Sequence, residues 1–94
     1  NNIRAALGKD GSFVIVYTPY GNPVHLNMEK LSGKNISGYW YNPREGNSIP
    51  IESFKNTKKV KAFVPPSSGS MTDWVLVLND QSKNYPDPAT FKLK

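Results

Sequence analysis

Short apolar runs separated by turn residues make up most of this chain. In some runs apolar side chains occupy every second position, which is the spacing of a strand with one buried face: residues 3–7, 24–28 and 60–64. Residues 13–17 and 74–78 are apolar at every position, which predicts central strands covered on both sides. No segment shows a sustained helical period of about 3.6 residues. The pattern therefore predicts an all-β domain.

Turn chemistry marks the ends of these strands. Asp10-Gly11 follows the first run and is a hairpin signal, because glycine adopts positive φ without a Cβ clash. Residues 36–41 predict another strand, which ends at a turn over 42–46 that contains proline and glycine. A short strand over 49–51 is ambiguous because Pro50 interrupts it.

The strands recur at a spacing of roughly ten residues, which is typical of a β-sandwich or a small barrel. We expect an antiparallel β-sandwich of about seven or eight short strands. Residues 1–80 form this domain. Residues 81–94 are polar and punctuated by proline. We expect them to form a C-terminal tail or an additional edge strand, with Phe91 and Leu93 as its apolar positions.

The composition narrows the class of protein. The chain has 94 residues, of which 37% are hydrophobic, enough for one domain with a single core. It contains no cysteine, which excludes disulfides and thiolate chemistry. No apolar run approaches the roughly 18 residues that a membrane span requires. The chain begins at Asn1 without an initiator methionine or a signal region, so we interpret it as part of a longer protein.

Candidate catalytic groups are scarce. His25 is the only histidine, and it alternates onto the polar side of its strand, which excludes a catalytic triad or a histidine-rich metal site. The seven acidic residues include no pair that the sequence places in a common cleft, as glycoside hydrolysis would require. We expect no catalytic residue, no metal and no cofactor.

The aromatic run Tyr39-Trp40-Tyr41 is the main candidate ligand surface. Alternation places Trp40 on the face opposite the two tyrosines, and we expect Trp40 to lie in the core. Tyr39 and Tyr41 are either half-exposed surface residues or a flat platform for sugar or proline rings. Tyr20 lies in a turn and is a further candidate for binding. Trp74 opens the most apolar strand, and we expect it to be structural.

Charge adds two features. The formal net charge of +5 favours contact with polyanions. Arg44 either grips a carboxylate of a ligand or neighbouring domain, or holds its own turn through a local ion pair. The densest basic stretch is Lys55, Lys58, Lys59 and Lys61. These lysines either bind a polyanion or protect an exposed strand edge. Nucleic acid is disfavoured because no recognition motif accompanies them.

Several turn and core motifs, taken in their order along the chain, resemble one family. They are Asp10-Gly11-Ser12-Phe13, Gly21-Asn22-Pro23-Val24, Leu31-Ser32-Gly33-Lys34, Trp40-Tyr41-Asn42-Pro43-Arg44-Glu45-Gly46, Pro65-Pro66 and Asp73-Trp74-Val75-Leu76-Val77-Leu78. Over about residues 3–80 the chain resembles the family called the putative collagen-binding domain of a collagenase. The resemblance implies a C-terminal domain of secreted bacterial proteins, behind an apiosidase-like (β/α)8 glycoside hydrolase domain.

These observations leave three hypotheses for function. The first is a non-catalytic accessory domain that packs against and stabilises the catalytic glycoside hydrolase domain of the same chain, in a secreted, periplasmic or cell-surface protein. The alternative is an extracellular polymer-binding module for polysaccharide or collagen, with Tyr20, Tyr39, Tyr41 and Arg44 as ligand-binding residues. The third is a weak binder of polyanions or nucleic acid.

Overall fold

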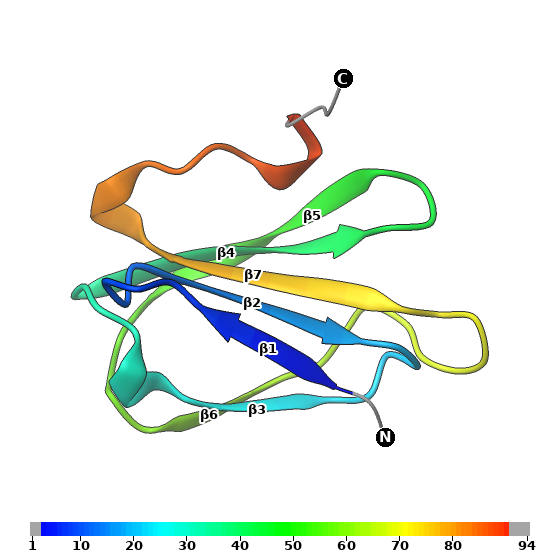
Figure 1. Ribbon diagram of the computed structural model, residues 1–94, viewed down its shortest axis with the longest axis horizontal. Coiled ribbons are helices and arrows are strands. Elements are labelled where there is room, and N and C mark those ends of the chain that lie inside the picture. Colours follow the sequence, from blue (N-terminus) through cyan, green and yellow to red (C-terminus); the bar gives the residue numbers. More distant parts are fainter. Residues whose placement is uncertain (1–2, 91–94) are drawn as a thin grey trace.

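The computed structural model describes residues 3–90, which form two antiparallel sheets packed face to face (Figure 1). The strands are β1 (Arg4–Leu7), β2 (Phe13–Thr18), β3 (Val24–Asn27), β4 (Asn35–Asn42), β5 (Asn47–Lys55), β6 (Val60–Phe63) and β7 (Trp74–Asp80). Three 3₁₀ helices are described, η1 (Met28–Lys30), η2 (Gln81–Lys83) and η3 (Pro88–Thr90). The structure confirms the expected all-β sandwich. No helix among residues 3–90 is long and apolar enough to span a membrane.

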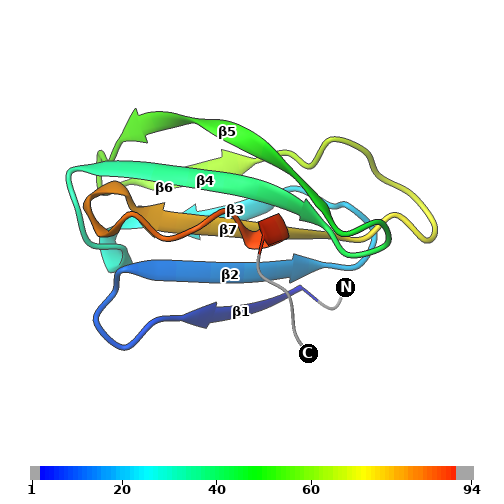
Figure 2. The ribbon, with the colours of Figure 1, turned by 90° about the horizontal axis from the view of Figure 1, so that it is seen from above.

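The two sheets differ in size. The larger sheet has five strands in the order β1-β2-β7-β4-β5, and the smaller sheet contains only β3 and β6. β7, the last strand among residues 3–90, therefore lies at the centre of the larger sheet, between β2 and β4. Seen from above, the smaller sheet lies beneath β7, β4 and β5, and no strand lies beneath β1 (Figure 2).

The core lies between the two sheets. Trp40 and Trp74 pack edge to face with ring centroids 6.5 Å apart, and both are buried. Both predictions of a core tryptophan are confirmed. Leu76 is fully buried and pairs with Val16 on one side and Trp40 on the other. This row of inward side chains joins the three central strands, and edge-to-face ring packing adds to its apolar burial.

The sequence predicted cover on both faces of the strands over 13–17 and 74–78, and this was wrong for β2. Ile15 and Tyr17 point away from the core and are exposed. On β7 the equivalent residues Val75 and Val77 are half-buried. The cause is architectural: the smaller sheet covers only the inner face, so the apolar outer residues of β2 have no strand above them.

The inward face of β6 also differs from the prediction. Val60 and Val64 are 68% and 70% exposed, whereas Phe63 is buried beside Phe54, with ring centroids 5.9 Å apart. Phe63 pairs with the buried Val24 of β3, so both side chains lie on the inner face of the smaller sheet. Val60 and Val64 are an odd number of positions from Phe63 and therefore point outward. β5 runs through Pro50 without a break, which an edge strand tolerates. His25 is exposed, as expected.

Residues 81–90 cross the outer face of the larger sheet (Figure 1). The Asp80 carboxylate caps η2 by accepting hydrogen bonds from the backbone and hydroxyl of Ser82, and these bonds hold its pKa below the usual range. The Tyr85 ring packs at 89° on Phe13, and its hydroxyl lies 2.6 Å from Ser12 Oγ. The expected apolar positions Phe91 and Leu93 lie outside the described residues.

Candidate functional site

An open hollow lies at the end of the sandwich where β2 and β4 finish and β7 begins. It is lined by Tyr17, Pro19, Tyr20, Arg44, Ser70, Met71 and Asp73. We call it the loop-end hollow. Tyr20 is 50% exposed within it, and Met71 is 86% exposed with a φ of 58°. A methionine in this left-handed region is strained, and such strain clusters at functional positions.

The turn that carries Arg44 is rigid. The Asn42 side-chain oxygen accepts hydrogen bonds from the backbone amides of Arg44 and Glu45, at 2.9 and 3.3 Å. The amide of Gly46 closes the turn on the Asn42 carbonyl at 2.8 Å, with a φ of 78° that favours glycine. The sequence signals of asparagine, proline and glycine thus place Arg44 on a fixed hairpin turn.

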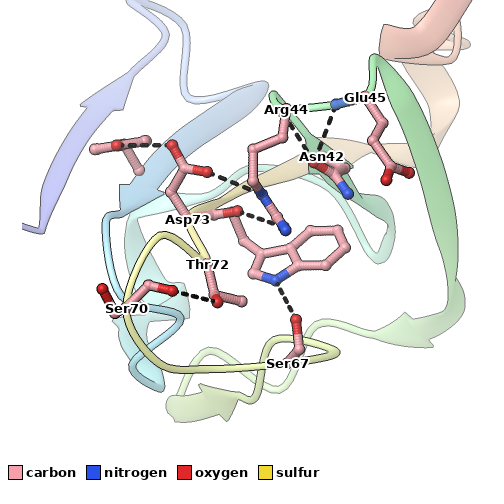
Figure 3. A network of polar contacts seen from close by, with 9 residues as sticks. Asn42, Arg44, Glu45, Ser67, Ser70, Thr72 and Asp73 are labelled. Carbon is pink, nitrogen blue, oxygen red and sulfur yellow. Dashed lines mark hydrogen bonds and ion pairs between the residues drawn. The ribbon is translucent and has the colours of Figure 1, made fainter.

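Arg44 joins two loops that lie far apart in the sequence (Figure 3). Its Nε lies 3.1 Å from Asp73 Oδ1, and a terminal nitrogen donates to the Asp73 carbonyl at 3.0 Å. The guanidinium also lies over the Trp74 ring, 5.0 Å from its centroid. The ion pair forms with Asp73 rather than with the neighbouring Glu45. A guanidinium makes these contacts at once because its donors are fixed in one plane.

Asp73 is shared with Tyr17. The Tyr17 hydroxyl donates to Asp73 Oδ2 at 2.9 Å, and this hydrogen bond to the carboxylate raises the pKa of the phenol. Nearby, Trp74 Nε1 donates to Ser67 Oγ at 3.1 Å, and Thr72 donates to the Ser70 carbonyl (Figure 3). The bonds of Asp73 to Tyr17 and Arg44 tie the loop before β7 to the rest of the sheet, and they fix two polar side chains at the hollow.

The four predicted binding residues lie on two surfaces. Tyr20 and Arg44 both line the loop-end hollow. Tyr39 and Tyr41 lie on the outer side of β4, where they pair with Val77 and Val75 of β7, and both are half-buried. Sequence reasoning missed Tyr17 and Asp73. The alternation in β2 already placed Tyr17 opposite the core residues, but no local pattern indicated its partner 56 residues away.

The second candidate surface is the outer face, meaning the outward residues of β2, β7 and β4. None of them is charged: Phe13, Ile15, Tyr17, Asn35, Ser37, Tyr39, Tyr41, Val75, Val77 and Asn79. The tail over residues 81–90 crosses this face and holds Phe13 through Tyr85. Ile15 and Tyr17 remain 41% and 37% exposed. An uncharged face of this kind is unusual on the solvent side of an antiparallel sheet.

The aspartates of the described residues serve local structure. Asp10 Oδ1 accepts from the Ser12 amide, and hydrogen bonds from Ser12 lower its pKa. Asp80 caps η2, Asp87 accepts a hydrogen bond from Ser48, and Asp73 holds Arg44. Among residues 3–90 no group of three histidine, aspartate or glutamate side chains is placed to hold a metal ion.

Comparison with known proteins gives a family and an architecture. A sequence model of the family described as the "putative collagen-binding domain of a collagenase" matches residues 1–79. A crystal structure of a glycoside hydrolase family 5 protein from Bacteroides vulgatus is 30% identical over 96% of this chain, with a TM-score of 0.78. A second structure, described as a glycoside hydrolase, is 28% identical over 89%, with a TM-score of 0.72. This chain spans only 19% and 21% of those two chains. No curated protein sequence matches it.

Proposed function

We propose that this chain, which belongs to the family described as the putative collagen-binding domain of a collagenase, is a non-catalytic accessory domain that packs against the catalytic domain of a secreted glycoside hydrolase. The two similar structures support the association, because in each of them a likeness to this chain occupies about a fifth of a glycoside hydrolase. Both the family and the association favour an extracellular bacterial protein.

The exposed apolar side chains on the outer face of β2 carry the proposal. Ile15 and Tyr17 are 41% and 37% exposed there. On the same face β1 places Ala6 beside Ile15 and the charged Arg4 beside Tyr17, at the margin of this surface. Neighbouring exposed apolar side chains with a polar or charged margin are typical of interfaces. The tail contacts β5 through Asp87 and the start of β2 through Tyr85, and it leaves Ile15 and Tyr17 exposed, so a partner domain can reach the face at these two residues.

The proposed role is mechanical rather than chemical. The aspartates that the structure describes cap turns, cap η2 or hold Arg44, so their carboxylates stabilise local structure. A domain that buries Ile15 and Tyr17 against a neighbour stabilises that neighbour, because unfolding either one then exposes the shared surface.

The test compares matched variants in the parent enzyme. Ile15→Lys places a charge on the proposed interface, and Val60→Lys places the same charge on an exposed valine of the smaller sheet. We expect Ile15→Lys to lower the melting temperature of the parent enzyme, while Val60→Lys leaves it unchanged. Neither variant should alter the melting of the 94-residue chain alone. Equal melting of both parent variants would count against docking through this face.

A second candidate function is polymer binding at the loop-end hollow. The half-exposed Tyr20 ring lies beside Arg44 and Asp73 there, a combination of flat apolar surface and polar groups that suits sugar or proline rings. Retention of the chain on insoluble plant polysaccharide and on collagen should fall on Tyr20→Ala, whereas Tyr39→Ala tests the outer face separately. If both variants are retained as well as the unsubstituted chain, the hollow is excluded as the polymer-binding site.

A further inference from the structure

An apolar groove opens into the core beside β1. Leu7 of β1 and Val14 of β2 line one side, and Leu26, Met28 and Leu31 line the other. Val14, Met28 and Leu31 are buried core residues, so the floor of the groove is the core itself. The groove exists because the two-stranded smaller sheet does not extend beneath β1 (Figure 2).

In the part of the chain that the structure describes, β1 is an edge strand that lacks the usual protection. Within the described residues it pairs only with β2, and all four of its residues are exposed. The opposite edge strand, β5, carries Pro50, Glu52 and Lys55, residue types that discourage further strand pairing. β1 carries one charge, Arg4 at its start, followed by Ala5-Ala6-Leu7.

The hydrogen-bond pattern shows which amides of β1 are available. The Gly8 amide donates to the Phe13 carbonyl at 2.9 Å, and bonded pairs alternate along an antiparallel ladder. The amides of Ala6 and Arg4 therefore point to β2, and those of Leu7 and Ala5 point away from it. The side chains of Ala5 and Leu7 lie on the inner side, the side of Val14, which is the side of the groove.

We propose that an extended segment of the catalytic domain adds a strand at the free edge of β1 and places an apolar side chain in the groove. The proposal rests on the proposed function and specifies how that docking occurs. Addition of a strand satisfies the amides of Ala5 and Leu7, and the groove selects a segment with apolar residues at alternate positions. Lys30 at the rim favours an acidic residue beside them.

The position of the groove supports this occupant. The outer face with Ile15 lies on one side of β1, and the groove with Leu7 lies on the other. A strand beside β1 contacts both apolar surfaces at once. In the two similar structures about four-fifths of the chain lies outside the region like this one, so a catalytic domain supplies ample segment length.

A single proline substitution in β1 tests the inference. Ala5→Pro removes an amide that points away from β2, so the β1–β2 ladder keeps its bonds. Ala5→Val retains the amide and is the matched control. We expect Ala5→Pro to lower the melting temperature of the parent enzyme and to leave that of the 94-residue chain unchanged, with Ala5→Val altering neither. An equal shift in both proteins, or no shift in either, overturns strand addition.

Hydrogen exchange supplies an independent readout. The amides of Ala5 and Leu7 should exchange more than about tenfold more slowly in the parent enzyme than in the isolated chain, because only the parent enzyme supplies the added strand. Protection already present in the isolated chain would assign the edge to another segment of this chain or to a second copy, and would overturn the proposal. If Ile15→Lys destabilises the parent enzyme while Ala5→Pro does not, the docking function stands and its strand-addition mode fails.

Discussion

Arg44 illustrates how much one exposed side chain contributes at this end of the sandwich. It links the turn after β4 to Asp73 and covers the Trp74 ring, with 36% of its side chain exposed. We predict that Arg44→Lys lowers the free energy of unfolding by about 1 kcal/mol, because an ammonium cannot make the two hydrogen bonds to Asp73 and lie over the ring together. Urea denaturation measures this. An unchanged midpoint would show that the exposed pair contributes nothing.

Tyr17 provides a titration prediction. The ordinary pKa of a tyrosine is about 10, and the hydrogen bond to Asp73 raises it in the folded chain. This bond therefore contributes stability that is present below the ordinary pKa and is lost as the pH rises through the folded pKa. We expect Asp73→Asn to bring the Tyr17 pKa back toward its ordinary value in an ultraviolet titration, with Tyr17→Phe assigning the signal.

A control carboxylate makes that titration decisive. Asp10 lies in the turn after β1 and bonds to Ser12, far along the chain from Tyr17. Asp10→Asn should leave the Tyr17 titration unchanged. If Asp10→Asn and Asp73→Asn shift it equally, the cause is the net charge of the chain rather than the hydrogen bond.

For single residues, the sequence predicted which side chains are buried better than it predicted which side chains contact one another. Trp40 and Trp74 were predicted in the core because large apolar side chains in β runs have few other places to go. The bonds of Asp73 to Arg44 and Tyr17 could not be predicted, since they join residues 29 and 56 positions apart. Whether the tyrosine candidates bind a ligand stays a prediction.

Among the elements, the tail over residues 81–90 gives the clearest prediction. Tyr85 packs on Phe13, and Asp87 bonds to Ser48 of β5, so the tail spans the outer face from β2 to β5. A chain ending at Asp80 should fold but lose about 1–3 kcal/mol of stability and bind more of a hydrophobic dye, because it uncovers apolar surface. Tyr85→Phe, which removes only the hydroxyl bonded to Ser12, is the matched control and should cost less. A chain of undiminished stability would mean that residues 1–80 suffice.

The strands were predicted more accurately than the faces they bury. Period-two alternation located β3 and the turn residues located the hairpins. Alternation could not choose the inward side of β6, because both Val60 and Phe63 are apolar and the choice depends on the pairing of Phe63 with the buried Val24 of β3. The prediction that β2 is covered on both faces was wrong, because an apolar run shows how apolar a strand is but not how many strands lie above or below it.

For the whole molecule, the distribution of charge predicts weak polyanion binding. Two lysines of the densest basic stretch have partners within the fold. Lys58 Nζ donates to the Leu31 carbonyl at 2.8 Å, and Lys61 Nζ lies 4.8 Å from the centroid of the Phe54 ring. Both are held by the fold rather than free to contact phosphates. We expect affinity for a single-stranded oligonucleotide to be low at about 50 mM salt and to fall steeply by about 200 mM. Fluorescence anisotropy measures this, and binding that persists at high salt would contradict it.

The fold class of the whole molecule could be predicted from strand spacing and turn chemistry, whereas the unequal sizes of the two sheets could not. The runs that form β1 and β3 have similar lengths and patterns, yet β1 joins the larger sheet and β3 the smaller. Strand order is set by long-range pairing, such as that of β2 with β7, which leaves no local signal.

The central position of β7 also determines when this chain can fold. β2 and β4 flank β7 but do not pair with each other, so the larger sheet consists of two separate hairpins until residues 74–80 arrive. A nascent chain therefore cannot complete this sheet until residues 74–80 have been synthesised, and closing such distant pairs makes folding slow. Until β7 joins them, the two hairpins lack their common neighbour, so the larger sheet gains its stability in one cooperative step.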